Sequence, residues 1–116
     1  MGKGKSALES QKKMIELAMK ITERVASSLP LVKVYVFGSR ARGDYLDISD
    51  IDLVFVLYGI KDKNVFERMY LLSPFITGNV DYIVLDESEE NRLPKDAKLL
   101  WSKDKGFVDI RVFLSD

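Results

Sequence analysis

The chain has 116 residues, of which 47% are hydrophobic, so it is long enough for one domain with its own core. Its 18 basic and 18 acidic residues give a formal net charge of zero, which argues against strong nucleic-acid binding because that needs a basic face. The absence of cysteine and histidine excludes disulfides, thiolate zinc sites and the most common general base.

We expect a single domain over residues 1–116, with residues 1–5 as a disordered tail. No apolar run approaches the ~20 residues of a membrane span, and the polar start does not resemble a secretory signal. These absences favour a cytoplasmic protein. A long helix follows the tail, with Ser6 and Glu9 spaced as a capping box and Pro30 helping to stop it. Apolar residues recur at helical spacing, as core packing requires: Met14, Ala18, Ile21, Val25 and Leu29.

Residues 31–37 are rich in β-branched and aromatic side chains and predict a strand. Gly38 and Ser39 then break the strand, and residues 40–43 fit a short helical turn. Glycine lets a ligand approach the backbone closely, and such a turn directs N–H groups at one spot that favours anions. The turn is therefore a candidate phosphate site with the Ser39 hydroxyl as a further donor, although such a pattern alone more often marks an ordinary turn.

Two arginines in this turn carry charge that a phosphate would need. Arg42 has a guanidinium whose geometry matches phosphate, but it has an equally good alternative in pairing with Asp44 or Asp47 and shaping the loop. We expect Arg40 to be a solvated side chain, with a place beside the phosphate path as the alternative.

A second feature is a pair of acids at the start of the apolar segment 51–57, which predicts another strand. Because side chains alternate along a strand, Asp50 and Asp52 point to the same side. Unpaired carboxylates near a core are costly unless a cation neutralises them or one is protonated, and Mg²⁺ favours such hard oxygen ligands. The alternative is a solvated strand end with two surface acids.

A third acid, Asp81, lies near the start of a further predicted strand at 80–85. If this strand lies antiparallel beside segment 51–57, the three carboxylates converge and can hold two metal ions, the arrangement used for in-line displacement at phosphorus. Asp109 competes for this role, but Arg111 lies two positions further on the same strand face, so we favour Asp81.

The remaining expected elements are a helix capped by Asp62 that runs to Leu72 and ends near Pro74, a polar loop at 87–91, a short helix at 93–101 and a strand at 107–114.

In combination, three motifs resemble those of the minimal nucleotidyltransferases, the smallest members of the DNA polymerase beta superfamily. They are Gly38-Ser39-Arg40-Ala41-Arg42-Gly43, Ser49-Asp50-Ile51-Asp52-Leu53 and Val80-Asp81. The resemblance implies an α/β (α+β) fold, a small mixed β-sheet flanked by helices. It also implies that Gly38 and Ser39 bind the triphosphate of ATP, with Arg42 as a further nucleotide-binding candidate. Asp50, Asp52 and Asp81 would then be the catalytic residues that bind Mg²⁺ in a two-metal site.

The same resemblance suggests a partner. Minimal nucleotidyltransferases are often encoded beside small helical HEPN proteins as toxin–antitoxin pairs, in which the transferase silences an RNase toxin by adding AMP to a tyrosine. We therefore expect AMP transfer from ATP to a hydroxyl of a HEPN-type partner, with self-association left open. Two alternatives are a non-catalytic antitoxin that acts by complex formation and a transferase for small molecules. The intact aspartates favour the enzyme, and the lack of a second domain disfavours the small-molecule acceptor.

Overall fold

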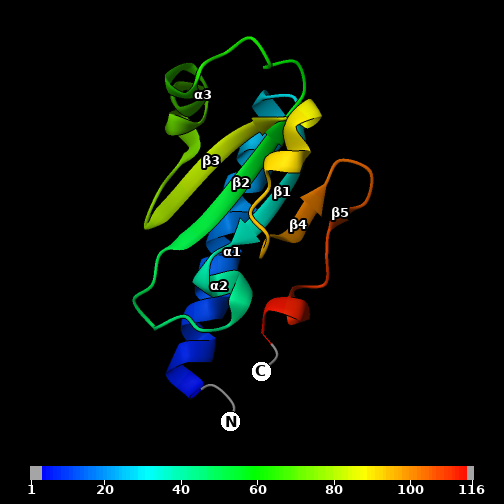
Figure 1. Ribbon diagram of the computed structural model, residues 1–116. Helices are drawn as coiled ribbons and strands as arrows, with labels where there is room; N and C mark the ends of the chain where they lie inside the picture. Colours follow the sequence, from blue (N-terminus) through cyan, green and yellow to red (C-terminus); the bar gives the residue numbers. More distant parts are fainter. Residues whose placement is uncertain (1–3, 115–116) are drawn as a thin grey trace.

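The computed structural model describes residues 4–114 and contains one five-stranded sheet with helices against it (Figure 1). The strands lie in the order β3-β2-β1-β4-β5, so β1 is central and β3 and β5 are edges. In chain order the elements are α1 (Lys5–Ser28), β1 (Leu31–Phe37), α2 (Ser39–Arg42), β2 (Ile51–Leu57), α3 (Val65–Leu72), η1 (Ser73–Phe75), β3 (Val80–Asp86), η2 (Glu87–Arg92), β4 (Lys98–Ser102), β5 (Gly106–Phe107) and η3 (Ile110–Phe113). This is the expected mixed sheet flanked by helices.

The neighbours of β2 differ in direction. Strand β1 pairs with β2 antiparallel, whereas β3 pairs with β2 in parallel, so the expected antiparallel pairing of β3 is wrong. A parallel pair needs a crossover connection, and the segment that contains α3 and η1 provides it. Because both strands then start at the same end of the sheet, Asp52 and Asp81 still become register partners.

The two faces of the sheet are covered unequally. Helix α1 packs its buried residues against alternate residues of β2 on one face, and this forms the main core. Its fully buried members include Ile15, Ala18, Val25, Leu53 and Phe55. The predicted helix with an apolar stripe is therefore correct.

The other face carries a smaller cluster of Val54, Val56 and Leu85, with Leu93 packed against it. The 3₁₀ helix η2 lies over part of this face, beside β3 and β2 (Figure 1). Strand alternation places Asp52 on the same face as Val54 and Val56. The acids therefore belong to the face that α1 leaves uncovered.

Both predicted helix caps are wrong. Helix α1 starts after Gly4 without a side-chain cap, and the Ser6 hydroxyl instead donates to Asp47 at 2.7 Å. Helix α3 is capped by Asn64 rather than Asp62, in a capping box with Glu67. The pattern that identifies a cap is short enough to recur by chance a few residues away from the real boundary.

The predictions for the C-terminal third are also wrong. Residues 93–101 form a turn and strand β4 instead of a helix. Strand β4 pairs antiparallel with β1, and this pairing satisfies the backbone hydrogen bonds on the side of β1 that faces away from β2. Segment 107–114 is the end of the two-residue β5 followed by η3 instead of a strand. The expected polar loop at 87–91 lies within η2, which Asp86 and Glu89 cap.

The predicted tail at residues 1–5 lies mostly outside the described residues, and Lys5 is already in α1. Within residues 4–114, no helix is both long and apolar enough to cross a bilayer.

Candidate active site

Three neighbouring strands bring the sequence motifs to one end of the sheet. Phe37, the last residue of β1, is the register partner of Asp52, which in turn is the partner of Asp81. Asp50 lies just before β2. Asp50 and Asp81 are exposed, whereas Asp52 is half-buried, so Asp52 occupies the innermost position of the three.

The surroundings of Asp52 disfavour the charged form of its carboxyl group. Burial raises the pKa of its carboxyl above the usual value, and the neighbouring carboxylates of Asp81 and Asp50 raise it further. Arg42 acts in the opposite direction. The site thus concentrates negative charge that an added cation would stabilise.

The turn after β1 lies directly against this carboxylate. Gly38 has a positive φ of 73°, and a Cβ placed on it would overlap Oδ2 of Asp52. Glycine is therefore required here both by backbone conformation and by the close approach. The candidate phosphate turn, although separate in sequence, therefore lies directly against one of the candidate metal ligands, Asp52.

Ser39 begins α2, a single helical turn that ends at Gly43 in the left-handed conformation. Within residues 4–114 the Ser39 hydroxyl makes no hydrogen bond, which leaves it available to a ligand. Ser39 therefore directly follows Gly38, the residue of the β1–α2 corner that lies against Asp52.

The expectation that Arg40 is solvated is wrong, since only 1% of it is exposed. Its Nη2 donates to the Ser49 carbonyl at 2.7 Å and to the Ser10 hydroxyl at 3.0 Å, and its Nη1 donates to Gln11 at 3.2 Å. The guanidinium also lies over the ring of Tyr45, 4.7 Å from its centroid. Arg40 thus ties the segment that leads to Asp50 onto α1.

One feature of the sequence could have predicted that Arg40 is buried. Gln11 is a fully buried polar residue on the inner face of α1, and its amide also donates to the carbonyls of Arg40 and Phe113. A polar residue among apolar positions of a helix needs a buried partner, and Arg40 is that partner.

Arg42 forms two ion pairs. Its Nη1 lies 2.7 Å from Oδ2 of Asp96, and its Nε lies 3.3 Å from Oδ2 of Asp44. The predicted pairing with Asp44 is therefore present, and the one with Asp47 is absent among the described residues, where Asp47 instead accepts from Ser6. Sequence reasoning missed Asp96, because it comes from a turn far along the chain that no local pattern links to Arg42.

The competing acid, Asp109, lies elsewhere. It caps η3 and forms an ion pair with Arg111, whose hydrogen bonds lower the pKa of Asp109 to about 2. Asp109 follows β5, at the edge of the sheet opposite β3. Asp81, in contrast, is the register partner of Asp52.

The acidic side chains of the site differ in how closely they are assembled and in how well they suit a metal ion. Among residues 4–114, no group of three or more acidic side chains is assembled closely enough to hold a metal ion as it stands. The available donors nevertheless fit a hard cation, because the half-buried Asp52 carboxylate carries a charge that Asp50 and Asp81 disfavour. We therefore treat the carboxylates as metal-ligand candidates.

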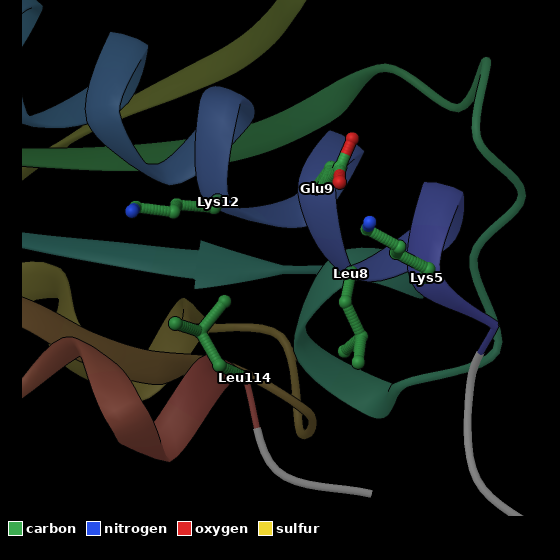
Figure 2. Close-up of a pocket in the computed structure, with 5 residues that line it drawn as sticks. All are labelled: Lys5, Leu8, Glu9, Lys12 and Leu114. Carbon is green, nitrogen blue, oxygen red and sulfur yellow. The ribbon is translucent and has the colours of Figure 1, made fainter.

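A separate groove lies between the first turns of α1 and the end of η3 (Figure 2). Leu8 and Leu114 face it from its two sides, and Lys5, Glu9 and Lys12 complete its lining. The groove includes none of the three site aspartates. It is thus distinct from the candidate active site.

Comparison with known proteins agrees with this geometry. The family model of the nucleotidyltransferase domain matches residues 18–105. A proposed nucleotidyltransferase from Sulfolobus solfataricus, solved by crystallography at 1.40 Å resolution, is 66% identical with a TM-score of 0.89, and the match covers 93% of this chain and 97% of that one. No curated protein matches the chain. Since the family model spans most of the chain, including every site motif, the chain belongs to the nucleotidyltransferase domain family and is an enzyme of that class.

Proposed function

We propose that this protein is a minimal nucleotidyltransferase that moves AMP from ATP to a hydroxyl group in the cytoplasm, with Mg²⁺ as cofactor. The observation that carries the proposal is the contact between Gly38 and Asp52, because it joins a glycine turn suited to phosphate to a carboxylate suited to a metal ion. The register pairing of Asp52 with Asp81 adds a second carboxylate at the same level of the sheet.

The nucleotide would lie across the β1–α2 corner. Gly38 permits the close approach of a phosphate to the backbone, and the Ser39 hydroxyl and the Arg42 guanidinium donate hydrogen bonds to it. Because Gly38 lies against Asp52, a phosphate held by these contacts would lie beside the carboxylates. Holding the reacting groups in position is a main contribution that a protein makes to such a transfer.

The carboxylates of Asp50, Asp52 and Asp81 would bind Mg²⁺, which supplies charge stabilisation at the reacting phosphate when it is bound. In the transfer step the acceptor oxygen forms a bond to the α-phosphorus, and the bond to the bridging oxygen breaks to release pyrophosphate. Asp81 is the candidate to take the hydroxyl proton, because it is exposed and is the register partner of Asp52. With no histidine in the chain, a carboxylate is the available base.

We further propose that the acceptor is a tyrosine of a helical HEPN-type toxin, so that AMP transfer neutralises the toxin. An acceptor from a second protein is consistent with the exposed position of Asp50 and Asp81 at the end of the sheet, where a partner's side chain can reach them. A tyrosine phenol has an ordinary pKa near 10 and needs a nearby base for attack at neutral pH.

The test is intact mass spectrometry of this protein and of the protein encoded by the neighbouring gene, after incubation with ATP and Mg²⁺. The proposal expects one or more AMP units on the partner. The double variant Asp50→Ala, Asp52→Ala should lose the transfer while it keeps partner binding. A tight complex without any mass change would instead identify a binding-module antitoxin.

A further inference from the structure

The Asp96 carboxylate occupies donors that the proposed function assigns to the nucleotide. Its Oδ2 lies 2.7 Å from Nη1 of Arg42, with only 26% of the Asp96 side chain exposed. The two residues are far apart in sequence, so the contact is a product of the tertiary fold. Arg42 and Asp96 also share the negative environment of Asp52, whose pKa Arg42 lowers and Asp96 raises.

The phosphate turn contributes to the same carboxylate. Hydrogen bonds from Arg42 hold the pKa of the Asp96 carboxyl below its usual range, and the backbone N–H of Gly38 lowers it further. An arginine and a backbone N–H are the donors that typically bind a phosphate oxygen. The protein therefore fills its own oxyanion position with a carboxylate.

The sheet fixes Asp96 in this place. Residues 94–97 form a turn in which the Ala97 N–H donates to the Pro94 carbonyl at 3.1 Å. The next residue, Lys98, is the register partner of Val36 on β1. The turn is thereby anchored just beyond the end of β1, beside Gly38, and the contact follows from strand pairing.

We propose that Asp96 is an internal competitor of the triphosphate: it holds Arg42 beside the Gly38 turn in the free protein and is displaced when a phosphate group binds. The inference rests on the proposed function, since it concerns the same donors. Binding exchanges one anion for another at Arg42. It also brings the negative triphosphate close to Asp96, so the displaced carboxylate must move away.

Calorimetric titration tests this exchange with two probes, ATP and inorganic tripolyphosphate. The variant Asp96→Asn removes the competing charge and should bind both probes about two- to fivefold more tightly, the size expected for release of a partly exposed ion pair. Asp62→Asn is the matched control, because Asp62 is exposed and makes no ion pair within residues 4–114. The control should leave both affinities unchanged.

A double variant separates exchange at Arg42 from general repulsion. In the Arg42→Ala background there is no arginine for Asp96 to hold, so adding Asp96→Asn should raise the affinity for the two probes only slightly. A full gain in that background would overturn the exchange, because the effect would then be repulsion between Asp96 and the probe alone.

The outcomes for the two proposals differ. Equal or weaker affinity of Asp96→Asn, in a protein that still transfers AMP, overturns the competitor and leaves the transferase standing. Tighter tripolyphosphate binding by Asp96→Asn without AMP transfer to any acceptor supports the competitor and contradicts the proposed function. Absence of binding of either probe to every variant contradicts both.

Discussion

At the scale of single residues, Gly38 is the position where the site tolerates least change. It combines a backbone conformation unsuited to other residues with a side-chain position that Oδ2 of Asp52 already occupies. Gly43 offers a comparison, because it also has a positive φ, of 95°, but a Cβ there meets no atom within 4 Å. The two glycines therefore separate backbone strain from displacement of the carboxylate.

We predict that Gly38→Ala and Gly43→Ala each lower the free energy of unfolding by about 1–2 kcal/mol, the cost of such backbone strain. Only Gly38→Ala should also lower AMP transfer, on the order of 100-fold, because it moves Asp52 by a distance that disrupts alignment. Urea denaturation and transfer rates measure the two effects. Equal rates for both variants would show that the Gly38 contact does not position Asp52.

At the scale of elements, the connection from α2 to β2 is held in place by one buried cation. Arg40 links α1 to the carbonyl of Ser49, the residue before Asp50. Its side chain is buried, whereas that of Arg42 is half exposed. Burial lowers the pKa of Arg40, while Tyr45, Asp47 and Asp50 raise it. The position of Asp50 therefore depends on an interaction inside the molecule.

Replacing Arg40 by Met should destabilise the protein by about 2–4 kcal/mol, because it leaves buried acceptors without a donor. Urea denaturation measures this change. Arg24→Met provides the control on the same protein: Arg24 is an exposed residue of α1, and the change should cost less than about 0.5 kcal/mol. Similar midpoints for the two variants would mean that solvent replaces the Arg40 contacts.

The elements also show what can be predicted from a sequence. Strands β1 and β2 and the motif residues were predicted because each is defined by neighbours along the chain. Strand β4 was missed, since residues 93–101 have no strong strand pattern and become a strand through pairing with β1. The Arg40–Gln11 and Asp96–Arg42 contacts were missed for the same reason: these partners lie 29 and 54 residues apart in sequence.

At the scale of the whole molecule, the two ends of the parallel pair β2–β3 have different chemistry. The candidate site lies where both strands start, and a hydrogen-bonded network lies where β3 ends. In this network Arg68 pairs with Glu89 at 2.6 Å, and Asp86 accepts from the Ile60 N–H at 2.8 Å and from Ser88. One end thus concentrates unbalanced charge while the other stabilises the fold.

The network predicts a specific acid sensitivity. Hydrogen bonds from Ser88 lower the pKa of Asp86 to about 2, and Arg68 lowers the pKa of Glu89. Groups with lowered pKa stabilise the folded state above their unfolded values near pH 4, and this stabilisation is lost as the pH falls toward 2. The thermal midpoint of Asp86→Asn should therefore fall less between pH 5 and pH 2.5 than that of the unchanged protein.

The control for the acid series is Asp104→Asn, a change at an exposed acid in the turn between β4 and β5. Its midpoint should follow that of the unchanged protein at every pH. Parallel curves for Asp86→Asn and the unchanged protein would assign the acid sensitivity to other carboxylates.

The central place of β1 has a consequence for the order of folding. One of its neighbours, β2, follows soon in the chain, but the other, β4, comes only after the whole β2–α3–β3 crossover. During synthesis, β1 therefore keeps an open edge until the last third of the chain emerges, and closing it is a long-range and slow step. Asp96 arrives with the same segment, so a nascent chain exposes Arg42 before its internal partner exists.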